Sequence, residues 1–543
     1  MVETMNRWYE LSFIMNVMLY KVSQFCASVI NFIVDRILAY MYDGKGKTVS
    51  PVKNPLLLKS ATKLARDIRR GKIKSVDAVK AYIVRILEVN PLVNATAECC
   101  FDDALNQARA VDLIVSSRKY SPELLAEEKP LLGVPITIKV LIGVKGLKHT
   151  AASKLFEDVV AEEDAPIVKQ LRDAGAIVLT TTNAPEMGLS METRNKLYGV
   201  ACNPFDTNRT SGGSSGGESA LISAGGSVLG IGNDIAGSLR IPAHFTGIFA
   251  HMPTRGLVPN EGSLPPKRLD PSDTRKPPLY KFLLAGPMCR YAEDLVTSMK
   301  VLSTHDEVRT RFGQQVDFSK LKVYYLTQMQ SPFMVPLEKE IKIALKKAVT
   351  HFKKHYNVPC KELKMSSLYD AGRCVVNRFL VLVEDVNDTL TCGRGLPFSE
   401  KLDFLKFLFG KSTLSFMTLL VMNIARFPIW CRKDQNTYFE KIEDQWIKEF
   451  DSLLDEDTVL LMPTLPFPAP YHCGMIPKLT VICYTGIFNV LGLPVTQCPL
   501  GFNKEGLPYG IQIVGGKNND PLTIACAVEL EKAFGGWKSP SRK

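Results

Sequence analysis

The sequence predicts an α/β protein. Two observations carry this prediction: segments with helical periodicity alternate with short apolar runs typical of buried strands, and no linker rich in Pro, Gly or Ser divides the 543 residues. Such alternation is typical of α/β architecture. With 46% hydrophobic and 22% charged residues, the composition is that of an ordinary globular protein with ample chain for a large core.

The globular part is expected to begin with helices. Val79, Ile83 and Ile86 recur at helical spacing after Ser75, which has the residue type of an N-cap. The helices predicted in this part cover residues 59–70, 76–89 and 103–116.

Strands and helices then alternate along the chain. Residues 132–139 form a short apolar run that ends in Lys139, and we expect a buried strand there. The further predicted elements are a helix at 165–174, strands at 176–181 and 321–326, helices at 337–355 and 436–454, a strand at 459–462, and a β-hairpin of 495–500 with 511–514 around Gly506.

Residues 402–430 are unusually apolar and leave little polar face. Two interpretations fit this pattern. The segment is either a pair of core helices or an apolar cap that dips into a bilayer or opens toward an apolar substrate.

The N-terminal stretch from Trp8 to Met41 is the first organisational feature. Between Leu11 and Val34 the only charge is Lys21, and the stretch is long enough to span a membrane. An amphipathic helix in the membrane interface and a buried soluble helix are the alternatives. The stretch is not followed by a cleavage site of small residues, so we do not expect it to be a signal peptide that is removed. We therefore expect a membrane-associated segment at residues 1–43 and one globular domain at residues 44–543.

Charge and cysteine usage narrow the function classes. The net charge of +12 fits a solvated basic surface or attraction to anionic lipid headgroups. Nucleic-acid binding is not expected, because no helix or arm gathers the basic residues in one stripe. The 13 cysteines show no CxxC pair and no zinc-ligand spacing with the histidines. We therefore expect no metal and no cofactor.

The chemistry is expected in the glycine-serine stretch from Arg209 to His244. It contains one turn with the sequence GGSSGG, a small-residue helix, an apolar strand and a second turn that ends at Ser238. Glycine at this density indicates positive φ angles or close backbone approaches. The first turn carries Ser214, so the two turns each offer a serine for covalent chemistry.

A serine nucleophile needs a base, and histidine does not fit here. Ser238 does not stand in a G-x-S-x-G elbow, and His244 lies on an apolar turn where a structural role is favoured. The first turn also lacks the GK[ST] that a phosphate loop requires. Lys139 lies between apolar residues, and burial would make its amine a neutral base.

These residues resemble the amidase signature family. The resemblance is carried by GGSSGGE at 212–218, by DIAGSLRIPAHFTGIF at 234–249 and by a lysine that ends an earlier strand, and it extends from about Asn54 to Trp537. It implies a central mixed β-sheet covered by helices on both faces. It also implies an amide hydrolase, and an N-terminal membrane helix fits it.

The resemblance further implies a Lys–Ser–Ser triad. In it Lys139 would be the base, Ser238 the nucleophile and Ser214 the serine that relays the proton, preceded by a cis peptide bond. Main-chain N–H groups would bind the oxyanion, and these belong to Ile235, Ala236, Gly237 and Ser238. The supporting residues would be Ser215, Asp234 and Arg240.

Three positions depart from the family pattern. Val140 stands where Asp or Glu commonly follows the catalytic lysine, Ala236 replaces a glycine before the nucleophile, and Met252 replaces a lysine. None of these changes removes a member of the triad. They bear on the rate and on the range of substrates.

The expected partners follow from the same resemblance: a fatty-acid amide or other amide as substrate, and membrane lipid at an intracellular membrane such as the endoplasmic reticulum or lipid droplets. The oligomeric state stays open, a homodimer included. Alternative functions are an amidase or esterase for small or aromatic substrates, a catalytically weakened lipid-binding protein, and a transferase that delivers ammonia to a tRNA-bound substrate.

Overall fold

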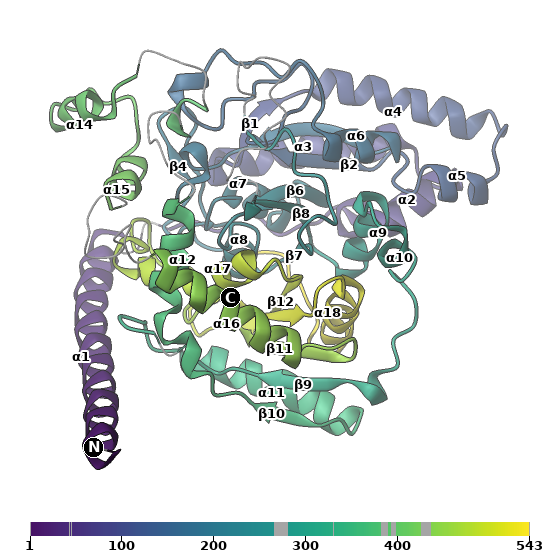
Figure 1. Ribbon diagram of the computed structural model, residues 1–543. Coiled ribbons are helices and arrows are strands. Elements are labelled where there is room, and N and C mark those ends of the chain that lie inside the picture. The colour runs from purple at the N-terminus through teal and green to yellow at the C-terminus, as the bar shows by residue number, and fades with distance from the viewer. Residues whose placement is uncertain are drawn as a thin grey trace, which may run out of the picture.

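One large sheet organises the molecule (Figure 1). The computed structural model describes residues 2–42, 44, 46–264, 281–329, 331–381, 389–392, 398–424 and 436–541, with the side chains of residues 2–20 left out. Within these residues the sheet has 11 strands in the order β1-β3-β2-β6-β8-β7-β12-β13-β11-β9-β10. Its strands are β1 (Thr96–Cys99), β2 (Pro135–Lys139), β3 (Ile177–Thr182), β6 (Leu229–Asp234), β7 (Phe249–Met252), β8 (Leu284–Cys289), β9 (Lys322–Tyr325), β10 (Cys360–Glu362), β11 (Thr458–Pro463), β12 (Val495–Phe502) and β13 (Pro508–Gly515).

The sheet is mixed. Strand β2 runs parallel to both β3 and β6, whereas β8 runs antiparallel to β6 and β7. The hairpin β12–β13 is antiparallel, and β11, β9 and β10 are parallel to one another. A separate two-stranded sheet joins β4 (Arg194–Asn195) to β5 (Gly199–Val200).

Helices cover both faces of this sheet, as two neighbouring positions of β12 show. Thr496 bonds to Thr523 of α18 on one face. Gln497 pairs in register with Gln512, whose side chain accepts a hydrogen bond from Arg240 of α8 on the other face. Successive strand side chains point to opposite faces, so α18 and α8 lie on opposite sides of the sheet.

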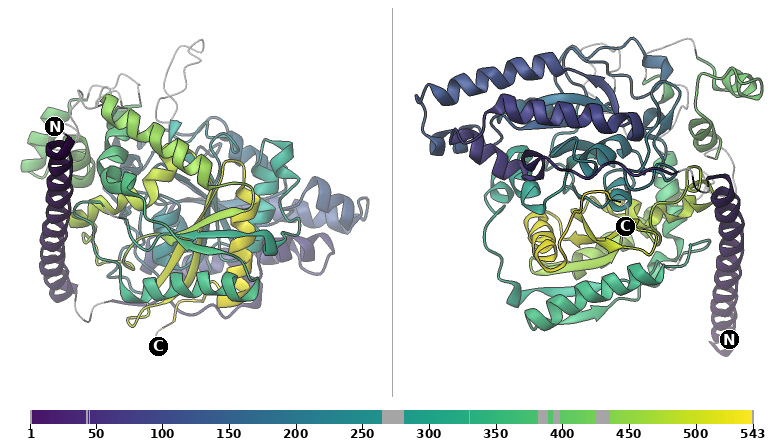
Figure 2. Two further views of the ribbon diagram at one scale, coloured as in Figure 1. Left: turned by 60° about the horizontal axis from the view of Figure 1, so that its bottom comes forward. Right: turned by 180° about the vertical axis from the view of Figure 1, so that it is seen from behind.

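Many helices surround the sheet (Figures 1 and 2). The helices that the structure describes are α1 (Val2–Tyr42), α2 (Ala61–Arg69), α3 (Ser75–Val93), α4 (Phe101–Ser116), α5 (Pro122–Glu128), α6 (Pro166–Asp173), α7 (Gly216–Ser223), α8 (Arg240–Thr246), α9 (Ala292–Leu302), α10 (Asp306–Arg309), α11 (Lys339–His355), α12 (Ala371–Val381), α14 (Glu400–Leu408), α15 (Phe416–Ile424), α16 (Asn436–Leu453), α17 (Cys483–Leu491) and α18 (Asp520–Phe534), with short 3-10 turns at Pro55–Leu58, Lys154–Phe156, Glu186–Gly188, Phe318–Lys320, Ser366–Asp370 and Ile476–Ile482.

The α/β prediction is confirmed, and each helix and strand predicted from the sequence is present within a few residues. One detail was wrong. Ser75 is not the N-cap of α3 but its first residue, and its hydroxyl donates to Gly133 O at 3.0 Å. The Asp112 carboxylate of α4 instead accepts from the N–H groups of Ser75 and Val76. A side chain from another helix thus satisfies the free donors of this helix start.

The apolar segment 402–430 divides into two helices, and residues 425–430 lie outside the described part. Helix α14 is not a core helix, because Leu405, Leu408 and Phe409 are 55–77% exposed. In α15, Leu419 and Met422 pack with other apolar residues. The core-pair interpretation is therefore wrong for α14, which leaves an apolar face exposed.

Candidate active site

Lys139 is the last residue of β2 and is fully buried. Its Nζ lies 2.6 Å from Ser214 Oγ and 2.6 Å from Asn233 Oδ1, with the main-chain oxygen of Asn233 at 3.4 Å. Burial lowers the pKa of Lys139 to about 7, against a smaller opposing effect of the charges of Asp234 and Glu218. A substantial share of the amine is therefore neutral at physiological pH.

Ser214 stands in the turn between β5 and α7. It is 2% exposed, and the peptide bond between Gly213 and Ser214 is cis. Glycines are required around it because other backbone comes close: a Cβ at Gly213 would lie 2.5 Å from Ser190 O. The Oγ of Ser214 also faces Gly188, where an added Cβ would lie 3.4 Å away.

Ser238 lies in the second turn, between β6 and α8. It is 8% exposed, so it is the more accessible of the two serines. The N–H of Ser215 donates to Ser238 O at 3.1 Å, and this bond joins the two turns. Lys139 at the end of β2 thus lies close to two turns that are distant in the sequence, those of Ser214 and Ser238.

A buried ion pair fixes the Ser238 turn. The Asp234 carboxylate accepts from the N–H groups of Gly237 at 2.6 Å and Leu239 at 3.0 Å, and Arg240 pairs with it at 3.0 Å. Burial alone would raise the pKa of Asp234, but the charge and donors of Arg240 hold this pKa below its usual value. Arg240 also donates to Asn489 of α17 at 2.6 Å.

Four main-chain N–H groups were expected to form an anion site in this turn. The N–H of Gly237 is committed to Asp234, so this group holds the turn. Within the described chain, the N–H groups of Ile235, Ala236 and Ser238 have no hydrogen-bond partner. Gly237 has φ +124°, and a Cβ there would overlap the hydroxyl of Thr485. Only glycine therefore fits at this position.

The three departures from the family pattern lie in packed surroundings. Val140 is fully buried in an apolar cluster with Leu141 and Phe156. Ala236 is 7% exposed, and its main-chain oxygen accepts from the hydroxyl of Thr485. Met252 is buried in the main core. In none of these places does the substituted side chain displace Lys139, Ser214 or Ser238.

Several residues that the sequence did not point to complete the site. Asn233 contacts Lys139 directly. Glu218 of α7 is fully buried and bonds to Thr137 and Thr182, and burial raises its pKa to about 7. Glu218 closes the GGSSGGE motif, but no role was predicted for either residue, because both act through the meeting of β2, β3, β6 and α7. His244 has the structural role expected, since it joins Phe467 O to the N–H of Gly510.

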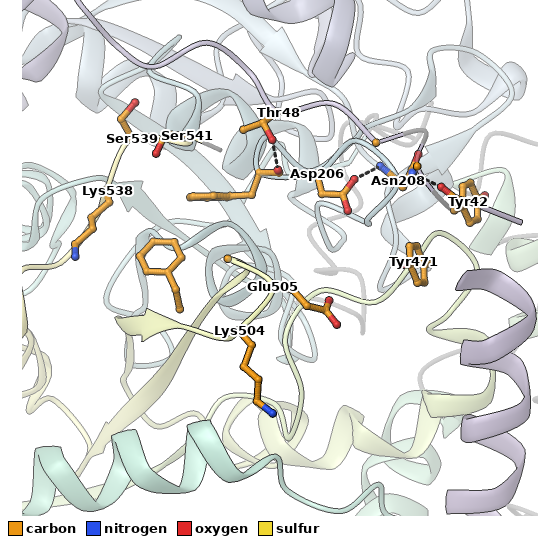
Figure 3. Close-up of a pocket in the computed structure, with 15 residues that line it drawn as sticks. Tyr42, Thr48, Asp206, Asn208, Tyr471, Lys504, Glu505, Lys538, Ser539 and Ser541 are labelled. Carbon is orange, nitrogen blue, oxygen red and sulfur yellow. Dashed lines mark hydrogen bonds between the residues drawn. The ribbon is translucent and has the colours of Figure 1, made fainter. Parts of the chain in front are cut away.

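A pocket of about 580 Å³ lies elsewhere, at the end of α1 (Figure 3). Tyr42, Asp206, Tyr471, Lys504 and Lys538 are among its lining residues. Neither Lys139 nor the two serines line it, so it is separate from the site described above.

Comparisons with known proteins place the chain in a family. The family model described as Amidase matches residues 77–524. Fatty-acid amide hydrolase 2-A of Danio rerio is 39% identical over 91% of this chain and 92% of its own length, and fatty-acid amide hydrolase 2 of Homo sapiens is 36% identical over 91% and 93%.

Solved structures share the fold. A structure described as fatty acid amide hydrolase superposes with a TM-score of 0.68 at 21% identity and covers 92% of this chain and 89% of its own. The 6-aminohexanoate cyclic dimer hydrolase in complex with substrate gives a TM-score of 0.69 at 22% identity over 89% and 99%. This chain therefore belongs to the amidase signature family and is an amide-cleaving hydrolase.

Proposed function

We propose that this protein is a membrane-associated serine hydrolase that cleaves fatty-acid amides through Lys139, Ser214 and Ser238. The observation that carries the proposal is the contact of the Lys139 amine with Ser214 Oγ at 2.6 Å in a fully buried setting. A buried amine with a pKa near 7 can accept a proton, which an exposed lysine cannot do at neutral pH.

The first step forms the acyl-enzyme. Neutral Lys139 takes the proton of Ser214 Oγ while Ser214 takes that of Ser238, whose Oγ attacks the amide carbonyl carbon. The carbonyl oxygen becomes an oxyanion, and the N–H groups of Ile235, Ala236 and Ser238 are available to stabilise it. Each such donor typically contributes about 3 kcal/mol to the transition state.

The second step releases the amine and regenerates the enzyme. The C–N bond breaks, and the proton held on Lys139 returns through Ser214 to the leaving nitrogen. Water then attacks the ester at Ser238 and gives its proton through Ser214 to Lys139. As the C–O bond to Ser238 breaks, this proton returns through Ser214 to Ser238 Oγ, and the carboxylic acid is released. Asp234, Arg240 and Ser215 support this cycle by holding the Ser238 turn in place.

The apolar helices α14 and α15 favour a long-chain substrate, because the start of α15 is bonded to a loop of the site. The Glu186 carboxylate accepts from Ser415 N at 2.7 Å and Thr418 Oγ1 at 2.8 Å, and so ties the start of α15 to the loop that carries Gly188. Gly188 packs against Ser214. Exposed apolar side chains of α14 thus lie on a hairpin that is connected to the site, and the relatives named fatty-acid amide hydrolase 2 agree with this substrate class.

Membrane association is proposed on the same grounds. One described helical segment, Lys21–Tyr42, is long and apolar enough to cross a membrane by length and composition. An intracellular membrane supplies fatty-acid amides dissolved among its acyl chains. Contact of the exposed apolar surface on α1 and α14 with the membrane would shorten the path of these amides to the site.

The test uses covalent labelling. A fluorophosphonate probe should label the wild-type chain at Ser238, and Ser238→Ala should abolish both labelling and amide turnover. Lys139→Ala should also lose turnover, whereas Ser211→Ala, at a buried serine in the same stretch, serves as the matched control and should keep it. Full turnover in a folded Lys139→Ala variant would contradict the base assignment. A series of acyl amides of increasing chain length separates the fatty-acid assignment from an amidase or esterase for small or aromatic substrates.

A further inference from the structure

The C-terminal half of α1 presents two different faces. Ser23, Ala27, Asn31 and Leu38 are buried against the body at spacings that fall on one side of a helix. Outward lies an exposed apolar face, and its large side chains are Val22, Phe25, Val29, Ile30, Phe32, Ile33, Ile37, Tyr40 and Met41. Apart from Leu38, the residues that face the protein are small or polar, whereas most of the exposed residues are large and apolar.

Polar bonds fasten the inner face of α1 along its length. Ser23 Oγ accepts from the N–H of Phe333 at 3.2 Å, and Asp35 pairs with Lys478 at 2.8 Å. At the end of the helix, Asn208 donates to Tyr42 O at 2.7 Å, beside the pocket drawn in Figure 3. From Ser23 to Tyr42 the helix rises about 28 Å, close to the thickness of a bilayer core.

From this we infer that α1 lies in the plane of a membrane, docked on the body, with its outward face among lipid acyl chains. This inference rests on the proposed membrane association and specifies its geometry. A docked helix could cross the bilayer only if the adjoining body entered the bilayer as well.

The contacts of α1 with the body argue against that crossing. They extend from Ser23 to Tyr42, so a crossing helix would carry the adjoining body into the bilayer core, the ion pair of Asp35 with Lys478 included. Lysine ammonium groups are strongly disfavoured in the hydrocarbon region. In the plane of the membrane, by contrast, only the apolar face of α1 meets acyl chains, and Lys21 and Arg36 can reach anionic headgroups.

Membrane topology tests this inference directly. The full chain, with one tag before Met1 and another after Lys543, is inserted into sealed microsomes and treated with protease from outside. Both tags should be digested together or protected together. Opposite fates of the two tags would show a spanning helix and overturn the inference, while failure to sediment with membranes would instead overturn the proposed membrane association.

A disulfide trap tests the docking. In a Cys26→Ser background, the pair Ser23→Cys and Phe333→Cys should cross-link in the membrane. The pair Val29→Cys and Phe333→Cys should not, because Val29 is on the outward face.

A flotation assay tests the contact of the outward face with lipid. Flotation with vesicles of phosphatidylcholine and phosphatidylserine should fall at least about fivefold for a Phe25→Gln, Phe32→Gln, Ile33→Gln variant. The control Val84→Gln, Leu87→Gln, Leu113→Gln removes equally exposed apolar residues of α3 and α4 and should float normally. A wild-type chain that does not float but forms dimers closed by α1 would mean that a second copy covers this face.

A second observation stands independently at the site. Asn233 is 1% exposed, its Oδ1 accepts from Lys139 Nζ at 2.6 Å, and its Nδ2 is buried without a hydrogen-bond partner among the described residues. A neutral amine has two N–H donors and one lone pair. If both donors point to the two oxygens of Asn233, which lie 2.6 and 3.4 Å from Nζ, the lone pair of the neutral amine is left for the Ser214 hydroxyl at 2.6 Å.

The geometry points to Asn233 as the positioning residue that aims the Lys139 lone pair at Ser214. The inference rests on the proposed triad. The side-chain oxygen of Asn233 accepts a hydrogen bond from the amine but carries no charge. A carboxylate at the same place would stabilise the ammonium form of Lys139. The charged groups that act on Lys139 from the neighbouring elements are Asp234, which Arg240 neutralises, and Glu218 of α7.

The pH dependence of fluorophosphonate labelling tests this role, because the label reports only on folded molecules. Asn233→Asp should move the acid limb of the labelling rate at least about one pH unit upward, and Asn233→Leu should slow labelling at least about tenfold without that shift. Asn233→Ser, which keeps an acceptor, should recover part of the rate. The control Asn203→Asp places a carboxylate at a fully buried asparagine away from Lys139. An unmoved acid limb in Asn233→Asp would overturn the role of Asn233, whereas labelling that survives Ser238→Ala would overturn the triad itself.

Discussion

The centre around Lys139 and the flank formed by α1 and α14 are built on opposite principles. At the centre nearly every side chain is buried and bonded, as the Asp234–Arg240 pair and its partners show. On the flank, large apolar side chains such as Phe25 and Phe409 are 70% and 77% exposed. Chemistry needs a dry and fixed arrangement, because a buried amine is neutral only when water is excluded. Contact with lipid needs exposed apolar surface instead. Changes at the centre should therefore affect the rate and stability, and changes on the flank should affect access.

The largest effect is expected from Lys139→Met. It keeps an unbranched chain of similar length but removes the base, so kcat/KM for an amide should fall by at least about 10³-fold. Circular dichroism and thermal unfolding should stay close to wild type, because the variant no longer buries an amine. A fall of less than tenfold would mean that the buried centre does not depend on this amine.

Loss of the buried ion pair should be the largest effect on stability. Arg240→Met leaves the Asp234 charge without its partner, and we expect the free energy of unfolding to fall by about 3–5 kcal/mol in urea titration. Lys169→Met, which breaks an exposed pair with Asp173, should leave stability almost unchanged. Equal effects of the two changes would remove the distinction between centre and surface.

Gly237→Ala tests how tightly the nucleophile turn is fixed. The added methyl overlaps the Thr485 hydroxyl at a positive φ, so the N–H groups beside it should be displaced and kcat should fall about 10²–10³-fold. Gly506→Ala is the matched control. Its φ is also positive, at +78°, but nothing lies within 4 Å of the added Cβ. A normal kcat in Gly237→Ala would show that this turn adapts.

The pH dependence follows from the lowered pKa of Lys139. The amine must be neutral to act as a base, so kcat/KM should fall about tenfold per pH unit below about pH 7 and level off above it. Burial of Lys139 costs stability: between about pH 7 and 10.5 the unfolded state binds a proton that the folded state lacks, so this cost falls and the free energy of unfolding rises as the pH rises. A rate that stays constant down to pH 5 would contradict a neutral lysine base.

The smallest effect is expected on the flank. Leu405→Gln with Leu408→Gln on α14 should leave the turnover of a short, soluble amide within about twofold, since neither residue belongs to the site. Turnover of a long-chain amide presented in vesicles should fall several-fold. An equal loss on both substrates would mean that α14 supports the centre and does not serve access.

Residue types and spacing were enough to predict the α/β class, the order of the main elements and the glycine-serine turns. Hydrophobic periodicity reports which face of each element is buried, and the dense glycines report a constrained backbone. The same reasoning singled out Lys139 as a lysine in dry surroundings, and the structure shows it buried. The resemblance to a family supplied the roles that we propose for the serines.

The contacts between distant segments could not be read in this way. No role was predicted for Asn233, Glu218 or Thr485, because their places near Lys139 or Ser238 arise where β2, β6, α7 and α17 meet. For the same reason Asp112, and not Ser75, caps α3. Local propensity is a property of neighbours along the chain, whereas burial, the lowered pKa of Lys139 and the docking of α1 depend on which segments fold against one another.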